Sequence, residues 1–121
     1  MPNPSIPKPE KVRLQHMLDA AHDALSFVEN RSRADLDSDR MLTLSLVKCI
    51  EIIGEAAAQV SIDWRAICSD IPWTDIVGMR NRLIHVYYDV NHDIVWQTIR
   101  QDLPNLIPKL EAILHPEPTE E

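Results

Sequence analysis

Polar and ionisable side chains are concentrated in nine consecutive positions of a largely apolar segment, residues 76–90: Arg80, Asn81, Arg82, His85, Tyr87 and Tyr88. Histidine titrates near neutral pH and can therefore move a proton, whereas arginine presents a planar set of donors that matches phosphate oxygens. Together these residue types could hold a phosphodiester and cleave it without a metal ion. The competing interpretation is that arginine and histidine near a helix C-terminus only bond its last carbonyls and favour its dipole.

The spacing of these residues constrains the helix that carries them. In a regular α-helix the five-residue step from Arg80 to His85 turns about 140°, so the two side chains would not share a face. The helix must end between them, or a second subunit must contribute one of them. In a helical continuation Tyr87 would return to the Arg80 side, whereas Tyr88 would be turned about 100° away.

Two acidic residues lie on one face of a second segment, the apolar stretch 41–60. Glu51 and Glu55 are four positions apart, and Lys48 lies on the same face. One interpretation is a narrow solvated stripe. The other is that the carboxylates face the site and tune His85 or Arg80.

We expect no metal site and no cofactor. The ligand-type residues that are close in sequence match no standard metal-binding spacing: His85, Asp89, His92 and Asp93. The two cysteines, Cys49 and Cys68, form no C-x-x-C motif, so we expect reduced thiols in a cytoplasm.

The overall composition is that of one soluble domain of 121 residues, 45% hydrophobic and 26% charged. The net charge is −7, of which residues 91–121 contribute −4. This balance disfavours a non-specific nucleic-acid binder with a broad basic face, but it leaves room for a small site of two or three arginines. No run approaches the roughly 18 apolar residues that span a bilayer, and no secretory signal is evident, so no membrane association is expected.

The fold class predicted by the pattern is all-α, since two glycines and nine prolines leave few turn residues for a many-stranded sheet. Apolar periodicity predicts helices from Glu10 to near Asn30, from Asp39 through residue 60, and from Trp73 to about His85. Residues 61–69 are predicted as a short helix or turn. Asn91 is a plausible N-cap for a last helix that Pro104 and Pro108 bend or divide.

These elements define a simple domain organisation. Residues 1–9 are predicted as a disordered arm, 10–115 as one helical domain, and 116–121 as a disordered acidic tail. Three tryptophans, Trp64, Trp73 and Trp96, are expected to anchor the core or an interface rather than to stack on bases. The apolar perimeter of the 41–60 helix independently favours a dimer, because a single small bundle has limited surface with which to cover it.

Several blocks of the sequence resemble one known family. The segment R-N-R-L-I-H-V-Y (Arg80–Tyr87) matches the R-x-x-x-x-H-x-Y motif of the HepT toxins, a branch of the HEPN ribonucleases. Further blocks occur in the expected order: I-E-I-I-G-E-A-A (50–57), I-P-W-x-x-I-V-G-M-R-N (71–81), D-I-V-W (93–96) and D-L-P (102–104). The resemblance covers roughly residues 10–112, and no departure from the motif is seen.

The resemblance implies a HEPN-type bundle of four to five helices that forms a two-fold homodimer, with both copies of the motif meeting in a cleft. It also implies metal-independent cleavage of RNA by attack of the ribose 2′-OH on the adjacent phosphorus. Carried over, His85 is the general acid/base and Arg80 the phosphate clamp. Asn81 would orient this pair, and Arg82 would be a weaker phosphate contact.

The resemblance further implies a partner and a second possible role. In HepT systems a small nucleotidyltransferase antitoxin transfers AMP to the motif tyrosine, here Tyr87. Without the resemblance, Tyr87 would be read as a core aromatic residue. The alternative function is a non-catalytic subunit that presents a nucleotide or substrate to a nucleotidyltransferase, which the acidic balance favours and the intact Arg80–His85 pair disfavours.

Overall fold

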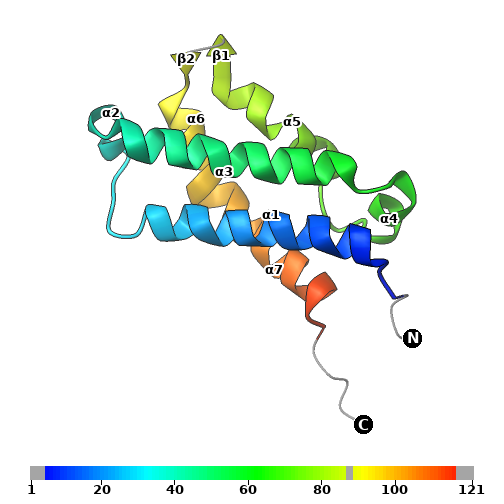
Figure 1. Cartoon of the computed structure of the whole chain (residues 1–121). Coiled ribbons are helices and arrows are strands. Elements are labelled where there is room, and N and C mark those ends of the chain that lie inside the picture. The colour runs from blue at the N-terminus through cyan, green and yellow to red at the C-terminus, as the bar shows by residue number, and fades with distance from the viewer. Residues whose placement is uncertain (1–4, 87–88, 117–121) are drawn as a thin grey trace.

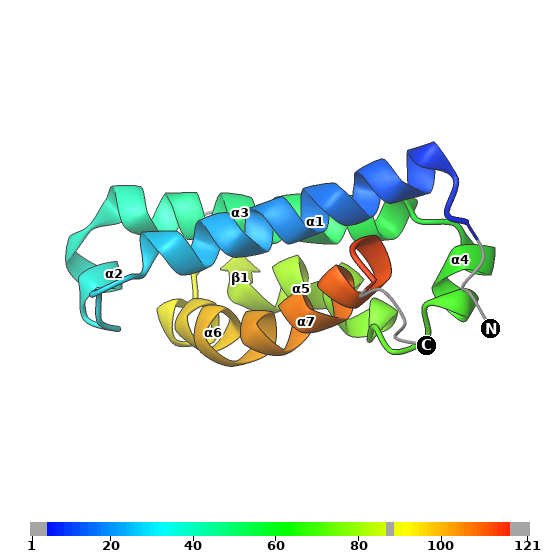
Figure 2. The same cartoon turned by 90° about the horizontal axis from the view of Figure 1, so that it is seen from below.

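The computed structural model describes residues 5–86 and 89–116, and within them the chain forms a helical bundle of two layers (Figures 1 and 2). The two longest helices, α1 and α3, lie side by side and run in opposite directions in one layer. The second layer consists of α5, packed on α3, and of the continuous α6–η1–α7 segment. The all-α prediction is confirmed. In chain order the elements are α1 (Lys8–Phe27), α2 (Asp35–Ser38), α3 (Arg40–Gln59), α4 (Ile62–Ile67), α5 (Trp73–Leu83), β1 (Ile84–Val86), β2 (Asp89–Val90), α6 (His92–Gln97), η1 (Thr98–Asp102) and α7 (Leu103–Leu114).

Side chains that cap helices explain where several elements begin. The carboxylate of Asp39 accepts a hydrogen bond from the Leu42 N–H at 3.1 Å and starts α3. Ser61 starts α4 in the same way, and Asn91 starts α6, as the sequence suggested. Helix α1 begins at Lys8, two residues before the expected start.

The linker between α1 and α3 contains a short element that periodicity did not indicate. Helix α1 stops at Phe27, and three residues later Asn30 takes a left-handed conformation, with φ of 60°, where the chain turns. Within the following polar stretch, Asp35–Ser38 forms the single turn of α2, which is too short to produce a hydrophobic period.

A small antiparallel hairpin follows α5, where the sequence had indicated a break. Helix α5 ends at Leu83, two residues before the expected end at His85, and Ile84 pairs with Val90 across β1 and β2. The backbone N–H of Asn91 donates to the carbonyl of Leu83 at 2.7 Å and closes the base of the hairpin. β-Branched Ile84 and Val86 favour this extended conformation.

The last helical segment is divided at Pro104, one of the two expected sites. Proline has no N–H to donate to the residue four positions earlier, and the turn before it widens into the π-helix η1. The Leu103 N–H donates to the carbonyl of Thr98, a five-residue step. Pro108, in contrast, lies inside α7 and does not divide it.

The core lies between the two layers and is almost entirely apolar. Its most buried side chains include Met17, Ile50, Ile53 and Leu110, each 0% exposed. Of the three tryptophans, Trp73 is buried, whereas Trp64 and Trp96 are partly buried against the same core. None of the helices in the described ranges is long and apolar enough to cross a membrane.

Candidate functional site

Helix α5 places Arg80 on its α3 side, where it meets an acidic residue of that helix. The Arg80 Nε lies 3.3 Å from the Glu51 Oε1, and the two side chains are 48% and 24% exposed. The predicted solvated stripe on α3 therefore has one member, Glu51, that is partly buried and engaged with Arg80, while Lys48 and Glu55 are exposed.

Helices α5 and α3 approach each other closely at Gly54. Gly54 lies one turn after Glu51, and a Cβ built on it would be 3.5 Å from the Ile76 carbonyl oxygen and 3.6 Å from that of Val77. These are ordinary contact distances, so the two backbones are close without excluding alanine. For the other helical glycine, Gly78, no atom lies within 4 Å of such a Cβ among the residues described. Of the two helical glycines, Gly54 is thus the one that lies at the contact between α3 and α5.

The ion pair between Arg80 and Glu51 is loose. Its separation of 3.3 Å exceeds the roughly 2.7–2.9 Å of a strong charge-assisted hydrogen bond. Because the Arg80 side chain is half exposed, opening the pair costs little. Glu51 can therefore orient the guanidinium while Arg80 remains able to bind an incoming phosphate.

His85 lies just beyond the end of the helix that carries Arg80. Between Ile84 and Val86, β1 advances by two residues while β2 advances by one, so His85 is the extra residue of a β-bulge. Bulges are common next to active sites, where they redirect a side chain. The end of α5 at Leu83 removes the 140° helical offset that the sequence placed between Arg80 and His85.

Among the residues that the structure describes, the other proposed site residues are not brought to the Arg80–Glu51 pair. The same helix end means that the helical argument relating Tyr87 to Arg80 no longer applies, because the helix does not continue to that position. Tyr87 and Tyr88 lie outside the described residues. Asn81 is exposed at the end of α5. Arg82, two residues after Arg80, is turned about 200° from it and faces α7 rather than α3.

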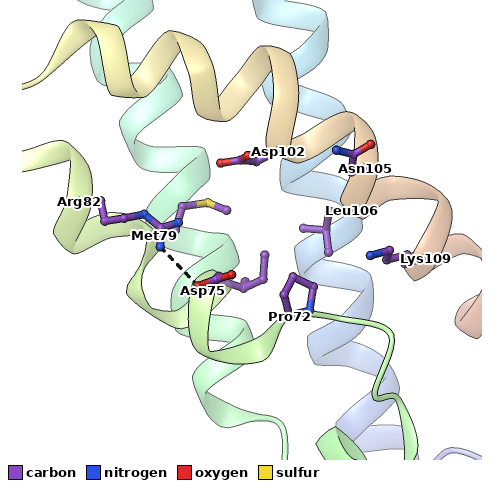
Figure 3. A pocket seen from close by; sticks show the side chains of 9 residues that line it. Pro72, Asp75, Met79, Arg82, Asp102, Asn105, Leu106 and Lys109 are labelled. Carbon is purple, nitrogen blue, oxygen red and sulfur yellow. Dashed lines mark ion pairs between the residues drawn. The ribbon is translucent and has the colours of Figure 1, made fainter.

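Arg82 lines a cleft on that opposite side of α5 (Figure 3). Its Nη1 lies 3.9 Å from the Asp75 Oδ1, a long separation between two well-exposed side chains. Helix α5 therefore lies between Arg82 and the Arg80–Glu51 pair, although the sequence had grouped the two arginines.

A charged cluster that sequence reasoning missed lies next to the base of the hairpin. Arg33 of the linker before α2 donates to Asp93 at 2.6 Å and to Asp37 at 3.1 Å, and His92 Nδ1 lies 2.8 Å from Asp37. The hydrogen bonds from His92 and Arg33 hold the pKa of the Asp37 carboxyl below its usual value. These contacts connect α2 to the first turn of α6, directly after β2. In the sequence, the four-residue spacing of Arg33 and Asp37 was the one sign of this ion pair.

Comparison with known proteins gives a consistent result. The family model described as "Ribonuclease HepT-like" matches residues 17–113. The chain is 38% identical over 104 residues, 86% of this chain and 93% of the other, to a protein of Caldanaerobacter subterraneus subsp. tengcongensis named "Putative RNase TTE0752". It is 30% identical over 95 residues, 75% of this chain and 86% of the other, to the "Probable ribonuclease HepT" of Thermococcus cleftensis. No solved structure matches.

Proposed function

The chain belongs to the HepT-like ribonuclease family, and we propose that it is a metal-independent endoribonuclease whose active site combines Arg80 and His85. The observation that carries this proposal is the end of α5 between the two residues, with Arg80 paired to Glu51 on one side and His85 at a bulge on the other. The break allows a phosphate clamp and a proton-transfer group to serve one site.

The proposed reaction is an internal transesterification. The ribose 2′-oxygen attacks the adjacent phosphorus, its proton is removed, and the bond from phosphorus to the 5′-oxygen breaks as that oxygen gains a proton. His85 carries these protons, and two copies of the motif in a dimer would supply both a base and an acid. Arg80 stabilises the charge that develops on the phosphoryl oxygens. Glu51 is a positioning residue for Arg80, and Asn81 would support the same end of α5.

This mechanism makes a direct prediction for purified protein. Single-stranded RNA incubated with the chain in excess EDTA is expected to be cleaved, because the reaction uses no metal ion. The 5′ fragments are expected to end in a 2′,3′-cyclic phosphate and the 3′ fragments in a free 5′-hydroxyl, which mass spectrometry of the fragments measures. An activity that requires a divalent cation would contradict the mechanism.

We also propose that the active form is a homodimer whose interface includes α3 and the Arg80–Tyr87 segment. The apolar side chains at the start of α3 support this, since Met41 is 80% exposed and Leu44, one turn later, is 49% exposed. A second copy that covers them would also bring two copies of the motif together.

Sedimentation velocity at micromolar concentration tests the dimer. The wild type is expected to sediment as a dimer, and a Met41→Glu/Leu44→Glu variant as a monomer, because the substitutions place charge in the interface. Ile62→Glu is the matched control, since Ile62 is 82% exposed on α4 and outside the proposed interface. A wild-type monomer at this concentration would contradict the proposal.

In the cell, we propose that the chain is the cytoplasmic toxin of a type II toxin–antitoxin module, with a minimal nucleotidyltransferase as antitoxin and Tyr87 as the residue that receives AMP. The second candidate function is a non-catalytic binding subunit of a nucleotidyltransferase complex. The net charge of −7 favours this second role, because it weakens long-range attraction of RNA. The cleavage assay in EDTA separates the two roles.

A further inference from the structure

A cleft of about 430 Å³ lies between α5 and the η1–α7 segment, on the side of α5 that faces away from Glu51 (Figure 3). Its volume is within the range of about 300–1,000 Å³ that is typical of small-molecule sites. Apolar side chains line part of it, among them Met79 and Leu106, which are only 1% and 2% exposed. The polar groups come from both walls: Asp75 and Arg82 from α5, and Asp102, Asn105 and Lys109 from η1 and α7.

The π-helix determines which side chains form the second wall. Asp102 is the last residue of η1, and Asn105 and Lys109 follow on α7 at steps of three and seven residues, so the three share one face. The wide turn of η1 adds a residue ahead of this face and rotates it relative to a continuous α-helix. π-Helical turns inside helices occur frequently at functional sites.

The chemistry of the cleft suits a ligand with an anionic group, an apolar face and polar edges. Arg82 and Lys109 supply cationic donors for a phosphate. Asp102 supplies an acceptor, and the Asn105 amide supplies both a donor and an acceptor. A nucleotide combines these features, because single-stranded bases are recognised by contacts to their faces and to their hydrogen-bonding edges.

We propose that this cleft binds a nucleotide of the RNA that flanks the cleaved phosphodiester, an inference that rests on the proposed ribonuclease function. Arg80 and Arg82 are two residues apart on opposite sides of α5, which is about 10–12 Å across with its side chains. An RNA strand that crosses the C-terminal end of α5 passes from the Arg80–Glu51 pair to the cleft. The loose Arg82–Asp75 pair opens for the flanking phosphate.

The carboxylate of Asp102 determines which base the cleft prefers. A carboxylate at neutral pH only accepts hydrogen bonds, so Asp102 favours bases that carry an exocyclic amino group: adenine, cytosine and guanine. Uracil has no amino group, and the N3–H on its Watson–Crick edge lies between two carbonyl oxygens that repel the carboxylate. The cleft therefore discriminates against uracil at this position.

NMR titration of the isotope-labelled full-length chain with AMP, CMP, GMP and UMP tests the proposal. The side-chain amide of Asn105 and the methyl group of Met79 report on the cleft directly. Both signals are expected to shift with the three amino-bearing nucleotides, with dissociation constants about 5- to 10-fold lower than for UMP. Asp102→Asn is expected to reduce this difference to within about two-fold, because its amide can donate to a uracil carbonyl. Asp19→Asn, the same charge change on an exposed site of α1, is expected to keep the full difference.

Three outcomes would overturn the proposal. Cleft signals that respond to no nucleotide at millimolar concentration would refute the site, and equal affinity of the wild type for UMP would refute the base preference. A response to a nucleotidyltransferase protein but to no nucleotide would assign the cleft to a protein partner. Because the readout does not require cleavage, RNA cleavage with a silent cleft refutes only this inference, and a responsive cleft without cleavage refutes only the proposed function.

Discussion

Replacement of His85 by alanine is expected to reduce RNA cleavage by about 10²- to 10⁴-fold, the usual contribution of a general acid/base. Arg80→Ala is expected to reduce it by about 10²- to 10³-fold, because a group that stabilises transition-state charge is lost. The measurement is the single-turnover cleavage rate of a defined single-stranded RNA in EDTA, with circular dichroism to verify that each variant is folded.

Matched substitutions on α1 serve as controls for these losses. His16 is exposed in the middle of α1. Arg13, also on α1, donates a hydrogen bond to Gln59 at the end of α3. His16→Ala and Arg13→Ala remove the same chemical groups away from α5 and are expected to keep the wild-type rate. A folded His85→Ala variant that retains full activity would contradict the proposed roles, whereas equal losses in the controls would indicate a non-specific effect of charge.

Transfer of AMP to Tyr87 is expected to abolish cleavage without unfolding the protein. The modification adds a negatively charged, bulky group two residues from His85, where it competes with the RNA phosphate for Arg80. Tyr87 rather than Tyr88 is the expected acceptor, because it occupies the tyrosine position of the R-x-x-x-x-H-x-Y motif.

Mass spectrometry after incubation with the cognate nucleotidyltransferase and ATP measures the modification. The wild type and Tyr88→Phe are expected to gain the mass of an AMP group and to lose activity, whereas Tyr87→Phe is expected to gain none. Tyr88→Phe is the matched control, because it removes the same hydroxyl one position away. Adenylyl mass that persists in Tyr87→Phe and disappears in Tyr88→Phe would show that the assignment is wrong.

Features that depend on local interactions were accessible from the sequence. A helix that starts at Asn91 needs only a side-chain oxygen near the N–H three residues later, and such spacing is visible without a fold. The lack of an N–H donor in proline marked Pro104 as a site where the helix could change, but it marked Pro108 equally, and α7 continues through Pro108. The long helices were also predictable, because their apolar residues recur at the spacing of one helix face.

Features that depend on tertiary packing were not accessible in the same way. Sequence left two interpretations of Glu51 open, and its contact with Arg80 exists because α5 packs on α3. The opposite directions of Arg80 and Arg82 follow from the turn of about 200° in a two-residue helical step, but what each of them contacts, Glu51 or the cleft, required the fold. The bulge at His85 depends on pairing between β1 and β2, which local propensity does not specify.

The wide turn at η1 determines where this protein can lose a residue. A π-turn holds one residue more than an α-turn, so removal of one residue between Thr98 and Asp102 would leave an ordinary α-turn and keep the direction of α7. The same deletion within α6 would instead rotate the following segment by about 100° and carry Leu106 and Leu110 out of the core. A one-residue deletion is thus expected to disturb the core less inside η1 than in the α-helix before it.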